Sequence, residues 1–253
     1  MSPQWIDEGA PVLQPGAIIL SSFPSAGLAA TVAAHYIIRS LDLPRIGLVI
    51  PAEGTSIAIV QSGRVNPPIR VYGRADLAIV LSELPVPPDL TTRLARMILD
   101  GAEHRKARLI IGLEGIVPHM ASEEELPKDE TIWAIPVRPD PKQVEQLKAA
   151  KARLLEDGAI GGVSGALLVE ALRRTLPVSI LLVSAGMAPE GFPDHRAGAA
   201  LIETLDRLLP ELKIDTGPLR TQAEMIERAL RASIKGREKE AQLPSKTEQT
   251  IYG

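Results

Sequence analysis

The sequence predicts an α/β protein built around a mixed, mostly parallel sheet. Short apolar runs at 17–20, 77–81 and 178–183, interrupted only by Ser179, have the length and composition of strands buried on both faces. Helical patterns alternate with these runs, and the order strand, helix, strand is typical of the crossover units of parallel sheets. Aromatic residues make up only 3% of the chain. We therefore expect helices to pack on the sheet through Ala, Leu, Ile and Val.

The first elements along the chain form one such unit. The strand over 17–20 leads into a helix over 28–38, which is apolar nearly all round and is predicted to be buried. The next strand is expected over 46–50. Two shorter runs at 56–60 and 69–72 are separated by turn residues, and their spacing predicts an antiparallel hairpin at an edge of the sheet.

The middle of the chain continues the alternation around one polar stretch. Residues 119–131 include five acidic side chains, so we expect an exposed insertion there. The elements predicted around it are strands over 77–81, 108–112 and 132–135, and helices over 89–101 and 139–156.

A glycine-rich turn at 158–165 opens the last third of the chain. It is predicted to lead into a helix over 166–174, followed by the strand over 178–183. Asp194 is expected to be the N-cap of the next helix, which carries leucines at helical spacing. The final helix is expected to begin at Pro218, because proline is suited to a first helical turn.

The end of the sequence differs from the rest in composition. Residues 236–250 carry three basic and three acidic side chains and almost no apolar ones, which is typical of a segment without a packed core. We therefore predict a single α/β domain over 1–235 and a flexible tail over 236–253. The tail closes on Ile251, Tyr252 and Gly253, an apolar tip that we expect to enter a pocket on another protein.

No arrangement of residues for catalysis, for a metal or for a cofactor stands out. The chain has no cysteine, and its four histidines are scattered without the paired spacing of metal ligands. The segment 162–166 is similar to a nucleophile elbow, but Ala166 stands where that motif requires glycine. No lysine follows its last glycine as in a phosphate loop. These glycines favour a helix-entry turn, although their backbone N–H groups could also bind an anion.

The remaining polar candidates have simple structural explanations. His35 lies in the apolar helix over 28–38 and is predicted to be a core residue with a satisfied ring. His195 follows Asp194, whose capping role explains the pair. The cluster 123–125 is expected to be solvated charge. We therefore expect no enzyme activity, no cofactor and no metal.

Charge and hydropathy exclude two classes of partner. The net charge is −3 and no dense basic run occurs, so binding to nucleic acid is not expected. No apolar run approaches the length of a membrane span, and the first residues lack the apolar region of a secretory signal. We expect a cytoplasmic protein.

Several segments in this order resemble the family of proteasome assembly chaperones of the second type and their archaeal relatives. The resemblance covers roughly residues 15 to 232. The segments that carry it are SSFPSAGLAATVAAHYII, ADLAIVLSELPVP, ARLIIGLEGI, GAIGGVSGALL and EGFPDHRAGAALIETLDRLLPELKIDTGPL.

This resemblance implies a fold, a partner and a site. The fold would be a three-layer α/β sandwich around a mixed sheet, similar to the nucleoside phosphorylase-like fold. Members are non-catalytic chaperones of proteasome α subunits, homo-oligomeric in archaea and heterodimeric in eukaryotes. Several end in a hydrophobic–Tyr–any motif (HbYX), which maps here onto Ile251, Tyr252 and Gly253. The terminal carboxylate would then pair with a lysine in a pocket between α subunits.

Three functions remain open at this point. The leading hypothesis is an ATP-independent assembly chaperone or adaptor that binds the α ring of the proteasome core particle through its tail. The second is an enzyme of phosphorylase-like fold that acts on a nucleoside-like small molecule, with a cleft near 158–165. The third is a tail-bearing activator of the mature proteasome.

Overall fold

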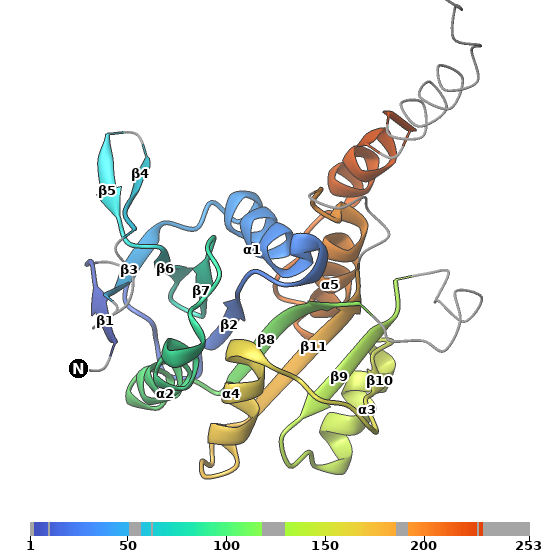
Figure 1. The fold of residues 1–253 in the computed structure, drawn as a ribbon. Helices are drawn as coiled ribbons and strands as arrows, with labels where there is room; N and C mark the ends of the chain where they lie inside the picture. Colours follow the sequence, from blue (N-terminus) through green and yellow to red (C-terminus); the bar gives the residue numbers. More distant parts are fainter. Residues whose placement is uncertain are drawn as a thin grey trace, which may run out of the picture.

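Within the residues that the structure describes, the chain forms a nine-stranded mixed sheet with helices on both faces (Figure 1). The computed structural model describes residues 3–9, 11–50, 57–61, 63–117, 130–185, 192–226 and 228–229. Across the sheet the strands are β1 (Gln4–Asp7), β3 (Arg45–Ile50), β6 (Ile69–Arg74), β7 (Leu77–Ser82), β2 (Ile18–Ser22), β8 (Leu109–Ile116), β11 (Val178–Ser184), β9 (Ile132–Pro136) and β10 (Arg153–Leu154).

The centre of this sheet is parallel. The strands β7, β2, β8 and β11 pair in parallel with one another, and antiparallel ladders begin outside them on both sides. Every residue of β2 and β7 is buried, as expected for strands covered on both faces. The predicted α/β fold around a mixed, mostly parallel sheet is confirmed.

Two helices lie on each face of the central strands. On one face are α1 (Ala29–Ser40) and α5 (His195–Leu208), and on the other are α2 (Pro88–His104) and α4 (Gly162–Ala171). A shorter helix, α3 (Pro141–Ala149), places Leu147 in the same core cluster as α1 and α5. The result is the three-layer sandwich that the family resemblance implied.

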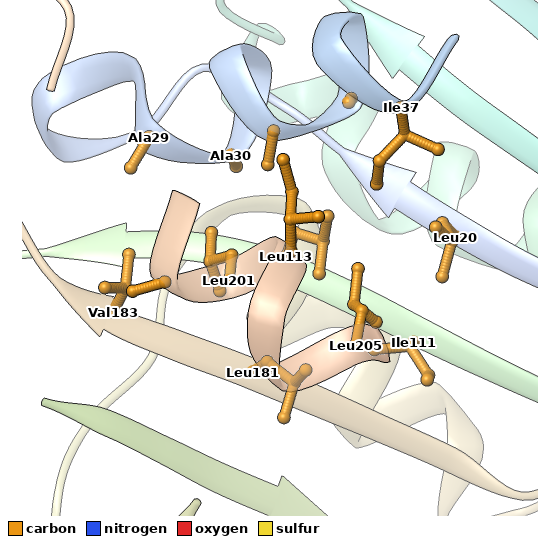
Figure 2. Close-up of a cluster of buried hydrophobic side chains, with 14 of the residues drawn as sticks. Leu20, Ala29, Ala30, Ile37, Ile111, Leu113, Leu181, Val183, Leu201 and Leu205 are labelled. Carbon is orange, nitrogen blue, oxygen red and sulfur yellow. The ribbon is translucent and has the colours of Figure 1, made fainter. Parts of the chain in front are cut away.

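Alternate side chains of the strands supply the two cores. Ile18 and Leu20 of β2 belong to the cluster beneath α1 and α5, whereas Ile19 points to the opposite cluster, as the two-residue period of a strand requires. Figure 2 shows side chains of α1 and α5, such as Ala30 and Leu201, in the same cluster as Leu113 of β8. The small side chains of α1 allow it to approach the sheet closely.

The predicted hairpin of 56–60 with 69–72 is wrong. Instead, β4 (Ile59–Gln61) pairs with β5 (Arg64–Asn66) in a separate two-stranded sheet, and Gly63 turns the chain between them with a φ of 72°. The strand β6 lies inside the main sheet between β3 and β7. The closer turn, with glycine at its positive φ, determines the pairing.

The unit β2–α1–β3 does not join neighbouring strands. The strand β3 runs in the same direction as β2, but β6 and β7 lie between them, and β3 pairs antiparallel with β1 and β6. The edge strand β1 was not predicted, because only four residues form it and most of them are exposed.

Two helix boundaries also differ from the prediction. The helix expected over 139–156 ends at Ala149, and 153–154 forms strand β10 instead. The helix expected over 166–174 begins four residues earlier, at Gly162, so the second half of the glycine-rich stretch is helical. By contrast, the capping prediction is confirmed, since the Asp194 carboxylate accepts a hydrogen bond from the Ala197 amide at 3.0 Å.

The last described element is a helix over 217–226, close to the predicted start at Pro218. Residues 118–129, most of the predicted acidic insertion, and the predicted tail over 236–253 lie outside the described residues. Among the helices that are described, each is too short or too polar to cross a bilayer.

Candidate functional site

The predicted partner-binding residues Ile251, Tyr252 and Gly253 lie outside the described residues. What the structure does describe is the helix over 217–226 that leads toward them. It packs beside α5 and then extends away from the sheet (Figure 1). Leu219 and Ala223 are the buried residues of this terminal helix. The hydroxyl of Tyr36 on α1 donates a hydrogen bond of 2.7 Å to the carbonyl of Asp215, just before the helix begins.

A glutamate on α5 holds the first turn of the terminal helix. The Glu203 carboxylate accepts hydrogen bonds from Arg220 through Nε at 2.7 Å and Nη2 at 3.1 Å, and from the Thr216 hydroxyl at 3.0 Å. This two-pronged geometry is the strong form of an arginine–carboxylate pair. The hydrogen bond from Arg220 is also the main reason why the pKa of Glu203 lies below its ordinary value.

The same arginine reaches the end of the predicted acidic insertion. Nη1 of Arg220 lies 3.5 Å from Oε2 of Glu130, the residue at which the described chain resumes before β9. Glu130 is half-buried rather than fully exposed. Arg220 therefore joins three parts of the chain: the terminal helix, α5 and the approach to β9.

The glycine-rich stretch forms a close contact rather than an open loop. A Cβ on Gly165 would lie 2.2 Å from the carbonyl oxygen of Ile160, so only glycine fits there. The Ser164 hydroxyl is buried and donates a hydrogen bond of 2.6 Å to Glu114 on β8. Burial raises the pKa of Glu114 to about 7. The side chain of Glu114 therefore lies beside the start of α4, where the sequence analysis had kept anion binding as an alternative.

A second polar group lies at the carboxyl end of β7. The Arg70 side chain is only 1% exposed, and its Nη2 lies 2.5 Å from Oε1 of Glu83. Its Nη1 donates to Gln61 at 2.9 Å. Nε2 of His35 lies 3.3 Å from the same Glu83 oxygen. Burial is the main cause that lowers the pKa of His35, although Glu83 raises it.

The predictions for the histidines are therefore only partly correct. The side chain of His35 is 40% exposed, so it is not a core residue, because its side of α1 faces the polar group and not the sheet. His195 begins α5 after its Asp194 cap, and its Nδ1 lies 3.0 Å from the Pro193 carbonyl oxygen. Within the described ranges, no group of three or more His, Asp and Glu side chains is placed to hold a metal ion.

Comparison with known proteins places this architecture in a family. The family model described as the PAC2 family matches residues 19–233. The chain belongs to the PAC2 family. The predicted family membership is thus confirmed, over almost the same range that the sequence motifs indicated.

Individual PAC2-like proteins are similar over most of their length. The uncharacterized protein MJ0106 of Methanocaldococcus jannaschii is 27% identical over 215 residues, which cover 85% of this chain and 84% of that protein. The crystal structure of Pyrococcus furiosus PbaA, an archaeal homologue of proteasome-assembly chaperone, superposes with a TM-score of 0.80 at 27% identity and 95% coverage of both chains.

A second Pyrococcus furiosus structure shares the fold alone. PbaB, an archaeal proteasome activator, superposes with a TM-score of 0.73 at 21% identity, covering 92% of this chain and 98% of that one. Its likeness confirms the PAC2 architecture of the sheet and helices.

The polar groups around Glu114, Arg70 and Glu203 were not predicted from the sequence. Glu114 had a recognisable signal, since it is the one charged residue in the apolar run of β8. Arg70 had a similar signal, since it stands between apolar residues of β6, but its partners lie on other elements and could not be predicted. Glu203 had no such signal. The contact of Glu203 with Arg220 depends on how the terminal helix folds back on α5.

Proposed function

We propose that this PAC2-family chain is an ATP-independent proteasome assembly chaperone or adaptor that acts in the cytoplasm. The observation that carries the proposal is the likeness to PbaA, described as an archaeal homologue of proteasome-assembly chaperone, over 95% of both chains. The partners would be α subunits of the core particle, bound by several copies of this chain in a homo-oligomer.

The contact would be made by the tail residues Ile251, Tyr252 and Gly253. An aliphatic side chain that becomes fully buried contributes about 1.5–3 kcal/mol, and a tyrosine can bury its ring while its hydroxyl keeps a hydrogen bond. Carboxylates at chain ends are captured in pockets of other proteins in the same way. One such tail binds weakly, because ordering it on binding costs conformational entropy. Several tails on one oligomer would bind more tightly, because the first contact raises the effective concentration of the others.

The function we infer is binding rather than catalysis. Ser164, the serine of the elbow-like segment, is 3% exposed and donates its hydroxyl to Glu114, which supports a structural role for it. If instead the segment serves a nucleoside-like substrate, nucleosides or phosphate should raise the melting temperature of the purified protein. We expect no such shift.

A pull-down on purified α subunits tests the tail. The variants Tyr252→Ala, deletion of Gly253 and addition of one residue after Gly253 should each abolish capture of α subunits. Thr250→Ala is the matched control, because it removes a polar side chain next to the motif, and it should bind normally. Undiminished binding by all three motif variants would refute the proposed contact.

A second measurement separates assembly from activation. Adding the protein during assembly of the core particle should raise the yield of particles, while peptide hydrolysis by mature particles should stay constant. An increase in hydrolysis by mature particles, without an increase in yield, would identify an activator instead.

A further inference from the structure

Several polar contacts hold the start of the terminal helix in place. Four polar contacts hold the base of that helix: the Tyr36 hydroxyl on the Asp215 carbonyl, the Thr216 hydroxyl on Glu203, and Arg220 on both Glu203 and Glu130. The partners lie on α1, on α5 and just before β9, so the base is held from three parts of the chain. A single attachment would leave the helix free to pivot about it.

Burial strengthens the central ion pair. The side chains of Glu203 and Arg220 are only 28% and 35% exposed, so water screens them less than a surface pair. Leu219 and Ala223 are only 3% and 5% exposed, so the side of the helix that they form is buried. Ionic and apolar contacts thus act on the same two turns.

Beyond Ala223 the helix makes no comparable contact among the described residues. Met225 is 65% exposed, and Glu224 pairs with Arg228 on the same helix, with side chains 54% and 79% exposed. In Figure 1 this part of the chain projects away from the sheet. The direction of the projection is therefore determined at the base, where Glu203 lies.

We propose that Glu203 is a positioning residue, which holds the terminal helix at one angle and so determines where the tail leaves the folded body. This inference rests on the proposed function, since it concerns how the tail reaches its partner. The gain in affinity from several tails depends on whether the positions at which the tails leave the folded body match the spacing of the pockets. A helix that swings freely would spread those starting points and weaken binding without changing the tail itself.

Spin labels can measure the angle directly, because the chain has no cysteine. Labels would be attached to Met225→Cys and Val169→Cys, which are both exposed and lie on the terminal helix and on α4. The distance distribution should be narrow in the parent and clearly broader in Glu203→Gln. Glu224→Gln is the matched control, because it removes the same charge from the exposed pair, and it should stay narrow. An unchanged width in Glu203→Gln would overturn the proposal.

Binding to purified α subunits supplies the second readout. Glu203→Gln should weaken binding by about fivefold or more, and a synthetic peptide of the last residues should displace the variant at lower concentrations than it displaces the parent. Melting temperature, measured alongside, should change little because the core sheet is untouched. Broadened distances with undiminished binding would overturn the positioning role.

The outcomes separate this inference from the function beneath it. If Tyr252→Ala binds normally, the proposed tail contact fails whatever Glu203→Gln does to the distances. If Tyr252→Ala abolishes binding but Glu203→Gln alters neither distances nor affinity, the tail contact stands and the positioning role fails.

Discussion

Glu114 shows how strongly a single side chain depends on its surroundings. It projects from β8 toward the start of α4, where Ser164 is its hydrogen-bond donor. Burial disfavours the charged carboxylate more than the hydrogen bond favours it, so its pKa rises from 4.5 to about 7. At neutral pH the folded protein therefore holds a partly protonated glutamate inside its sandwich.

This residue should make stability depend on pH. Between pH 4.5 and 7 the unfolded chain releases the proton while the folded chain keeps it, so the free energy of unfolding falls as pH rises, by at most about 3 kcal/mol. Glu114→Gln keeps the hydrogen bond without the charge and should be more stable than the parent at pH 8. The check is urea unfolding from pH 4.5 to 8.

A control with the opposite sign is available on α4. The hydrogen bond from Arg96 lowers the pKa of Glu170, so the stability that this pair adds is lost as pH falls. Glu170→Gln should weaken the protein most at neutral pH. If the free energy of unfolding of Glu114→Gln depends on pH in the same way as that of the parent, the Glu114 carboxyl is not held in its protonated form.

At the scale of elements, the helices α1, α2 and α3 are each followed by a residue other than glycine in the left-handed conformation. The residues Asp42, Lys106 and Lys151 have φ values of 47°, 53° and 64°, in the left-handed region that glycine usually occupies. In each case the next amide donates back to the helix five residues earlier, as Ala152 does to the Leu147 carbonyl at 3.0 Å. The residue that follows is buried each time: Leu43, Ala107 and Ala152.

Replacing the end residue of α3 tests this account. Lys151→Gly should raise the free energy of unfolding by about 0.5–1 kcal/mol, because glycine removes the steric cost of the left-handed backbone. The matched control is Lys148→Gly, one turn earlier within the helix, which should lower it by roughly 0.5–1 kcal/mol. Thermal unfolding of the two variants beside the parent is sufficient. Equal destabilisation by both would contradict the account.

At the scale of the whole molecule, the division into body and tail can be tested by truncation. The buried residue of the described chain nearest to the C-terminus is Ala223. We therefore propose that 1–235 folds as one α/β domain without 236–253. A chain ending at residue 235 should keep the parent's circular dichroism and melting temperature. A fall of several degrees would mean that the tail belongs to the folded body.

Which segments become strands and helices was largely predictable. The apolar composition of runs such as 77–81 and 178–183 is enough to predict buried strands. Asp194 predicts the start of a helix, because its side chain is suited to an N-cap. Helix ends at Asp42 or Lys151 were not predictable, because a charged residue in the left-handed region has no sequence signature. The edge strands β1 and β10 are too short and too exposed to show a pattern.

By itself the sequence determined the α/β class, the PAC2 family and most of the core elements, since apolar periodicity is local. It also carries the prediction of a binding tail at Ile251, Tyr252 and Gly253. Only the tertiary structure decided that β6 lies between β3 and β7, that Glu114 meets Ser164, and that Glu203 holds Arg220. Such contacts join residues far apart in the chain or on different elements, and their free energy exists only after the sheet and helices have assembled.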